Sequence, residues 1–422
     1  MRPFFGRRFS IIVFLFCITT TVTVESWAEP GDSRSIPFTL TQIMELVDRA
    51  NPALGIARYR RESAEAALIT ARAYPNPDLD VGGGSSTGIG PGALNGPNEQ
   101  LYLSQPLDLP FVRSARRRVA EAGIDSANLA NRAVRLMVNA QVKQGFFEIL
   151  RRESELAIAR DNERLLTQIR DKVAVKVDVG EAPRYEVVKA EAELLNAVKL
   201  RESSAVRVMD AKSALRALFG SALPADFEVE GELPKTPDRL PELATLREQV
   251  EAHQPLIAQS RIEADKAEAR LKLEETLRYP QPTLKAGVER DPGLEQWRVG
   301  IALPLPLWNQ RQGPIAEAAA DVEQMRATAR QIELSTLREL ENAYNRFLIA
   351  QRQVETFETG LLKQAEAALK VAETAYRLGE RGILDYLDAQ RTFRGVRNDY
   401  INSRFDRQAS LIDLERLQAF DR

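Results

Sequence analysis

The sequence predicts a mainly α-helical protein with a small β part, built as an internal duplication. Three observations support this fold class. Two very long runs, Phe111–Val179 and Ile315–Leu378, contain no proline. Short segments between helical runs alternate apolar and polar residues, as strands do. A set of landmark motifs recurs about 200 residues further along the chain, which is typical of an internal repeat.

The repeated landmarks occur in the same order in both halves. They are Asn51-Pro52 and Gln254-Pro255, then Gln105-Pro106-Leu107 and Leu303-Pro304-Leu305, then Val179-Gly180-Glu181 and Leu378-Gly379-Glu380. Each half is therefore expected to contain a helix, two strands, a very long helix and a further helix. The predicted division is a signal peptide at 1–28, a first repeat at 29–220, a linker at 221–239 and a second repeat at 240–422.

The long helices are predicted from apolar residues at helical spacing. Leu337, Leu340, Tyr344 and Phe347 are spaced by three and four residues, which places them on one helix face as a coiled-coil-type seam. Some 65 helical residues would span roughly 100 Å. Helices of this length do not fit a compact domain, so the expected form is a rod, a coiled coil or a tube.

The strand segments are apolar on one face. In the last of four such segments Trp297, Val299, Ile301 and Leu303 alternate with Arg298, Gly300 and Ala302. This pattern matches strands tilted through a bilayer, with those four residues facing lipid; a soluble cap on a helical rod would show a similar pattern. Four strands cannot close a barrel in lipid. If they span the membrane, three chains would share one twelve-stranded barrel.

The first residues form an export signal. Arg2, Arg7 and Arg8 precede the apolar stretch Ile11–Val24, and small residues lead to a cleavage site after Ala28, as in a secretory signal peptide; a retained membrane anchor is the alternative. Cys17 follows Phe16, whereas a lipoprotein signal needs a small residue before its Cys. The exported chain is therefore expected not to be lipidated.

Composition argues against several classes of protein. Lys and Arg total 58 against 60 Asp and Glu, which speaks against nucleic-acid binding. The basic run Val112–Arg118 is better explained as a membrane-surface or solvated helix face. With one Cys and one His, His253, the chain offers no metal-ligand set. No catalytic grouping or phosphate loop is present, so we expect no enzyme activity, no cofactor and no resident metal.

One stretch carries a family resemblance over and above these patterns. The sequence from Tyr376 to Ala389, YRLGERGILDYLDA, resembles the turn into the last inner helix of the outer-membrane efflux (TolC) family, and the resemblance covers both halves of the chain. It implies a trimeric channel of the bacterial outer membrane, with a β-barrel in lipid and a helical tunnel in the periplasm. It also implies a periplasmic adaptor (membrane fusion) protein and an inner-membrane pump of the RND type as partners.

The resemblance assigns site residues. Asp385 and Asp388 would ring the periplasmic constriction of the pore, and Glu186, Tyr376 and Arg381 would make the gate contacts, with Glu186 as the acidic partner of Arg381. Residues at i and i+3 do share a helix face, and six carboxylates around a threefold axis would favour cations. The alternative is that acidic residues at a helix N-terminus simply meet the helix dipole.

A second motif points to a branch of the family. The segment from Pro304 to Ile315, PLPLWNQRQGPI, resembles a turn of the heavy-metal (CzcC-like) efflux channels, although drug-efflux channels carry similar turns. The expected function is a gated, passive exit duct of a three-part efflux system, with heavy-metal cations as one candidate cargo. The alternative from another class is a soluble periplasmic adaptor with a single helical hairpin between compact β-domains.

Overall fold

The computed structural model describes residues 37–92, 94–234 and 240–419. The predicted signal peptide 1–28 lies outside these residues, as do the last five residues of the predicted linker. The helices of the first half are α1 (Leu40–Ala50), α2 (Pro52–Arg72), α3 (Pro110–Asp178), α4 (Arg184–Ala217) and the 3₁₀ turn η1 (Gly220–Ala222). Those of the second half are α5 (Leu243–His253), α6 (Pro255–Thr276), α7 (Gln312–Thr356), the π-helical turn η2 (Phe357–Leu361), α8 (Leu362–Arg377) and α9 (Ile383–Leu417).

The same element order occurs in both halves, and equivalent side chains hold it. Asn51 caps α2 by accepting from the backbone N–H of Ala53 at 2.8 Å, and its Nδ2 donates to the carbonyl of Leu218 at 3.0 Å. Gln254 caps α6, and its Nε2 donates to the carbonyl of Leu417 at 2.9 Å. Each amide thus joins the start of one helix to the end of another, which satisfies backbone groups that helix termini leave free.

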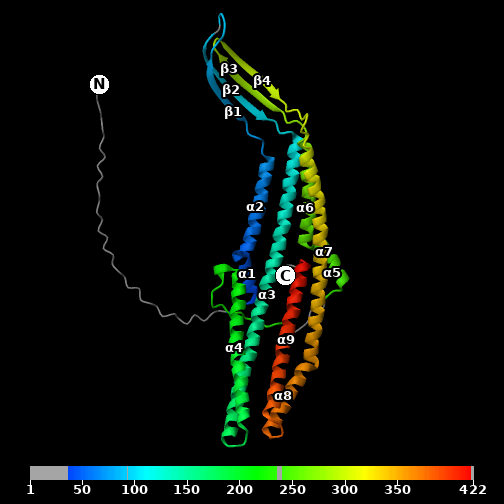
Figure 1. Ribbon diagram of the computed structural model, residues 1–422. Helices are drawn as coiled ribbons and strands as arrows, with labels where there is room; N and C mark the ends of the chain where they lie inside the picture. Colours follow the sequence, from blue (N-terminus) through cyan, green and yellow to red (C-terminus); the bar gives the residue numbers. More distant parts are fainter. Residues whose placement is uncertain (1–36, 93, 235–239, 420–422) are drawn as a thin grey trace, which may run out of the picture. The chain divides into compact units, whose positions relative to one another are not determined.

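The long proline-free runs are helical, with one difference between the halves. The first forms α3, a single helix of 69 residues. The second, expected as one helix, is divided by η2 into α7 and α8 (Figure 1). At this π-helical turn Tyr400 of α9 donates from its hydroxyl to Glu358 at 2.8 Å. Phe357 packs against the Tyr400 ring with centroids 5.9 Å apart. The extra backbone residue per turn therefore serves a contact with α9.

The two turns that carry the repeated glycines have the same backbone geometry. Gly180 between α3 and α4 has φ +80°, and Gly379 between α8 and α9 has φ +76°. The following N–H groups reach back to helix carbonyls, from Glu181 to Lys176 at 2.8 Å and from Glu380 to Ala375 at 3.0 Å. A left-handed residue followed by such a bond is a standard helix C-terminus, and glycine adopts it without strain.

The strands form one antiparallel sheet in the order β1-β2-β3-β4. Their bounds are Asp78–Ser86, Gly96–Pro106, Thr283–Asp291 and Leu294–Ala302. The register places the apolar residues of all four strands on one face, since Val81, Leu101, Val288 and Trp297 are successive cross-strand partners. This face is exposed in the single chain: Trp297 exposes 78% of its surface and Val81 73%.

The opposite face of the sheet is polar. Gly287 faces Tyr102, and a Cβ at Gly287 would lie 2.3 Å from the tyrosine ring. Because glycine leaves this space, the ring can cross the strand, and its hydroxyl lies 3.3 Å from Glu289. Glu289 also pairs with Arg298 at 3.1 Å. The predicted alternation on the strands is thus present.

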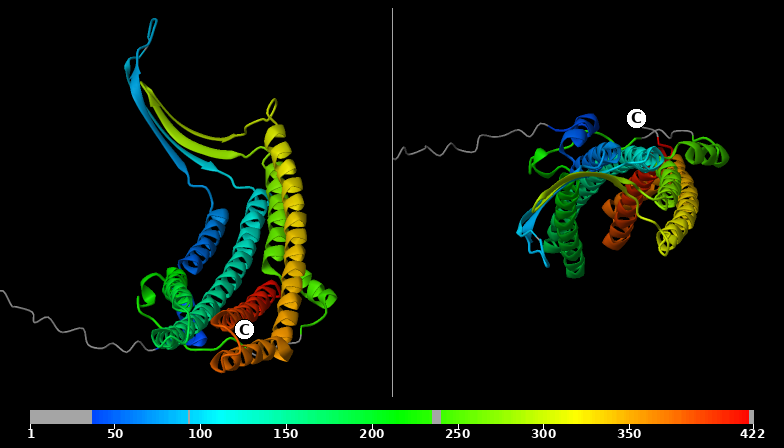
Figure 2. Two further views of the ribbon diagram at one scale, coloured as in Figure 1. Left: turned by 60° about the horizontal axis from the view of Figure 1, so that its bottom comes forward. Right: turned by 90° about the horizontal axis from the view of Figure 1, so that it is seen from above.

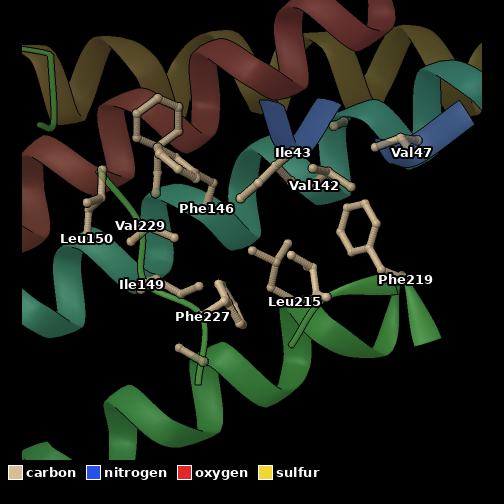
Figure 3. Close-up of a cluster of buried hydrophobic side chains, with 14 of the residues drawn as sticks. Ile43, Val47, Val142, Phe146, Ile149, Leu150, Leu215, Phe219, Phe227 and Val229 are labelled. Atoms are coloured by element: carbon tan, nitrogen blue, oxygen red, sulfur yellow. The ribbon is translucent and has the colours of Figure 1, made fainter. Parts of the chain in front are cut away.

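The helices α2, α3, α6 and α7 form a layer in that order, because α2 contacts α3, α3 contacts α6 and α6 contacts α7. Figure 2 shows this layer as an arc, with α4 and α9 on its concave side. The largest apolar cluster joins α1, α3, α4 and the segment after η1 (Figure 3). Phe219 and Phe227 are each 2% exposed there. Burial of this kind contributes about 1.5–3 kcal/mol per large side chain.

Candidate functional site

The site predicted from the sequence lies at the two glycine turns, at the end of the helices opposite the sheet (Figure 1). Here α9 begins at Ile383 with one face buried and one exposed. Ile383, Tyr386 and Leu387 pack against an apolar cluster that includes Leu166 and Val173 of α3. Asp385 and Asp388 lie on the other face of α9 and are both exposed. The structure therefore presents the two predicted carboxylates to the surface of one subunit.

Arg381 pairs with Asp385, with Nη1 and Oδ2 3.4 Å apart. The family resemblance implied Glu186 as the acidic partner of Arg381. Within one chain no such pair is present, and Arg381 instead contacts the carboxylate of Asp385 one helical turn ahead. A contact of Arg381 with Glu186 of a neighbouring subunit stays a prediction.

Tyr376 joins the two turns through its ring. The ammonium of Lys176 on α3 lies 4.8 Å from the Tyr376 ring centroid, and the ring stacks on Tyr386 with centroids 6.0 Å apart. The Tyr376 hydroxyl is buried and has no hydrogen-bond partner among the described residues. Burial, and then the negative charge of Glu186, raises the pKa of Tyr376. Tyr376 and Glu186 are thus brought together, although not by a hydrogen bond.

Burial, assisted by the charge of Glu373, raises the pKa of Tyr386 to about 12. The Tyr386 hydroxyl therefore keeps its proton at alkaline pH values at which an ordinary tyrosine ionises. The two predicted gate residues of the second half, Tyr376 and Arg381, lie with Glu186 at one end of the described helices. Their surroundings fit a contact region between helix pairs.

Two cross-repeat contacts at this end were not predicted. Arg391 of α9 pairs with Glu193 of α4, and Gln390 of α9 donates to Asn162 of α3. The hydrogen bond to Glu193 and the charge of that carboxylate raise the pKa of Arg391. A signal for Glu193 existed in the sequence: Ala190, Glu193 and Ala197 share the buried face of α4, so a charge interrupts an otherwise small, apolar seam.

At the other end of the molecule, β4 places Trp297, Val299 and Ile301 on the apolar face of the sheet, 65–78% exposed. Leu303, predicted as a fourth residue of this strand, lies one residue beyond the end of β4 and is half exposed. Ala302 pairs with Thr283 at the start of β3, so the next position would set Leu303 opposite Pro282, which has no N–H to donate to the strand ladder.

None of the helices in the described ranges is both long enough and apolar enough to cross a membrane. No group of three or more His, Cys, Asp or Glu side chains in this part of the chain is placed to hold a metal ion. The arrangement at the glycine turns offers charged and aromatic contacts between helices. It offers no assembled catalytic group within the described residues.

Long paired helices joined to a sheet with one exposed apolar face define the class of this protein as a membrane-channel subunit. The chain belongs to the outer membrane efflux protein family, whose model matches residues 44–221 and 246–419, and its function is that of an outer-membrane efflux channel. The family match covers both halves, so the alternative of a soluble adaptor with a single hairpin is not supported.

Individual relatives agree with this assignment. The chain is 29% identical over 369 residues to the cobalt-zinc-cadmium resistance protein CzcC of Cupriavidus metallidurans, covering 86% of each chain. It is 22% identical over 398 residues to the outer membrane protein TolC of Escherichia coli, covering 87% of this chain and 79% of TolC. Its fold matches the CmeC outer membrane channel of Campylobacter jejuni with a TM-score of 0.77 at 17% identity, over 94% and 90% of the two chains. The predicted resemblance to the efflux family is confirmed.

Proposed function

We propose that three copies of this chain assemble into one outer-membrane duct, with a shared twelve-stranded β-barrel above a helical tunnel. The supporting observation is that sheet and helix layer run in the same order. The layer is α2, α3, α6, α7 and the sheet β1, β2, β3, β4, and each strand is joined to the helix of the same rank. The subunit therefore has two free edges on opposite sides. One is formed by α2 and β1, and the other by α7 and β4.

These edges suit a head-to-tail contact between neighbours. An edge strand left open in lipid is costly, and pairing β1 of one chain with β4 of the next removes every edge. The helix edges also carry exposed apolar residues: Tyr59 and Ile69 on α2 are 62% and 73% exposed, and Leu334 and Ile349 on α7 are 68% and 59% exposed. A heterologous contact that closes after three copies would cover both sets.

The mechanism in this proposal is gated passive conduction. Asp385 and Asp388 of three subunits ring the constriction and favour cations, while Glu186, Tyr376 and Arg381 hold neighbouring helix pairs together. Engagement of a periplasmic adaptor (membrane fusion) protein and an RND-type inner-membrane pump separates these pairs. The proposed location is the outer membrane with a long periplasmic part, without lipidation and with the apolar sheet face in lipid.

The proposed cargo class is heavy-metal cations. It rests on the relative CzcC, which is named for cobalt, zinc and cadmium resistance and is more similar to this chain than TolC is, at 29% against 22% identity. A conduit needs no ligand set of its own, since the pump selects the cargo. In this proposal the chain has no enzymatic role and no cofactor.

Planar-bilayer recording tests the proposal. The purified mature protein, shown to be trimeric in mild detergent by light scattering, should give small cation-selective conductance steps. The Asp385→Ala/Asp388→Ala double variant should give larger and less selective steps. If the folded protein is monomeric in mild detergent, the proposal of a shared barrel is wrong. Equal conductance steps in the parent and the double variant would still support a channel, but would show that the two aspartates do not form its constriction.

A further inference from the structure

A polar cavity lies between α3, α4 and α9, apart from the residues of the proposed gate. Its volume is about 240 Å³. Polar side chains from all three helices line it, namely Asn162, Ser204, Arg207, Arg394, Asn398 and Asn402. Two of these six are cationic, and the amides can donate as well as accept.

The cavity wall contains buried polar atoms that the described residues leave unpartnered. Asn162 is only 4% exposed; its Oδ1 accepts from Gln390, and its Nδ2 has no partner. The Oδ1 atom of Asn398 is also buried without a partner. Buried polar groups in folded proteins are nearly always hydrogen-bonded. One free donor and one free acceptor therefore point to a ligand that can both accept and donate.

The two arginines that line the cavity have no ion pair of their own among the described residues. Arg394 is partly buried and forms no ion pair or hydrogen bond with the described residues, and the same holds for the exposed Arg207 at the rim. The acidic side chain in the wall, Glu155, is already paired with Arg152 at 2.9 Å. Burial, partly offset by Glu193 and reinforced by Arg391, lowers the pKa of Arg394. A guanidinium nevertheless remains charged in proteins.

Water alone accounts for only part of this arrangement. The cavity is roomy enough for several water molecules, and these could satisfy the two free amide atoms. They would not neutralise two guanidinium groups, whose planar forks match the oxygen atoms of a carboxylate or phosphate. An oxyanion that keeps a proton offers acceptor oxygens to Arg394 and Asn162 and an O–H to Asn398.

We propose that this cavity is a binding site for a small protonated oxyanion, held between Arg394 of α9 and Arg207 of α4, with hydrogen phosphate as its probe. Such an anion joins the two helices that start at the glycine turns. The site is independent of the channel proposal, because its test is a binding measurement on protein in detergent.

The experiment is calorimetric titration of the purified mature protein with sodium phosphate at pH 7, with sodium chloride keeping the ionic strength constant. Saturable binding is expected in the parent. The Arg394→Gln variant should bind about tenfold or more weakly, since it loses a charged hydrogen-bond donor. Arg397→Gln is the matched control: Arg397 lies three residues further along α9, beside the Phe393 ring, and its loss should leave binding unchanged.

Two further arms keep the test decisive. Sulfate has no proton to donate at pH 7, so it should bind more weakly than phosphate; equal binding would overturn the protonated-oxyanion assignment. Arg207→Gln changes an exposed side chain, so it tests the site even if Arg394→Gln does not fold, and it too should weaken phosphate binding. Parent-like binding by both arginine variants, or no saturable binding by the parent, would overturn the site.

Discussion

Arg391 on α9 and Glu193 on α4 form an ion pair that joins the two halves of the duplicated chain. The Nε atom of Arg391 lies 3.4 Å from Oε2 of Glu193, and Glu193 is only 9% exposed. The pair lies on α4 and α9, the helices that start at the proposed gate. The negative charge of Asp388 also helps to raise the pKa of Arg391. This ion pair therefore connects two helices within one subunit, and it is distinct from the contacts proposed between subunits.

Replacement of Arg391 by Gln should remove the ion pair with Glu193. A nearly buried carboxylate that loses its charged partner costs about 1–3 kcal/mol, so the free energy of unfolding should fall by that amount in chemical denaturation. The double variant Arg391→Gln/Glu193→Gln should recover part of the loss, because no buried charge then remains unpaired. Strictly additive losses in this double-mutant cycle would show that the two side chains do not interact.

The two exposed aspartates of α9 can be separated by function. Asp385 is in the first turn of α9 and pairs with Arg381, so Asp385→Asn should lower helix stability by about 0.3–1 kcal/mol through lost dipole and ion-pair interactions. Asp388→Asn should leave stability nearly unchanged but reduce cation selectivity in bilayer recordings. Loss of stability without any change in selectivity for either variant would favour the helix-dipole explanation of these residues.

The apolar sheet face can be tested on one strand. Val299→Arg or Ile301→Arg should impair trimer assembly, because an arginine on a lipid face costs about 2–4 kcal/mol at the bilayer midplane. Gln296→Arg is the control, since Gln296 lies on the opposite face of β4. Yield of detergent-stable trimer after membrane extraction is the readout. Normal yield from both lipid-face variants with a defect in the control would reverse the face assignment.

Tyr386 predicts an alkaline limit to stability. Its pKa is raised from 10.0 to about 12 in the folded chain, so the folded state holds this proton more tightly than the unfolded state does. The contribution of Tyr386 to the free energy of unfolding is fully present below pH 10 and is lost as the pH rises toward about 12. Thermal unfolding followed between pH 9 and 12 should show a decline that Tyr386→Phe makes shallower. An identical decline in both proteins would assign the alkaline limit to other groups.

Much of the fold could be predicted because it depends on local rules. Proline-free runs with helical spacing gave α3 and α7, and alternation gave the faces of the four strands. The division of the second run at η2 could not be foreseen, since the extra residue is stabilised by Tyr400, more than forty positions away. Leu303 was placed in β4 because the apolar alternation continues past the residue where pairing stops.

The candidate site was less predictable because it depends on the register between helices about 200 residues apart. The family resemblance pointed to the glycine turns and to Asp385 and Asp388, which the structure leaves exposed. It paired Arg381 with Glu186, whereas within the chain Arg381 meets Asp385. The pair Glu193 and Arg391 depends on how α4 and α9 are aligned, and neither residue alone identifies the other.

The order of the sheet has a consequence for genetics. Under the proposed threefold closure, every barrel needs a sound β1 edge and a sound β4 edge from all three of its chains. A defective edge in one chain leaves the ring open, however sound its neighbours are. In a cell that makes intact and edge-damaged chains in equal amounts, random mixing would leave only about one ring in eight free of damage. Mutations confined to β1 or β4 should therefore act dominantly.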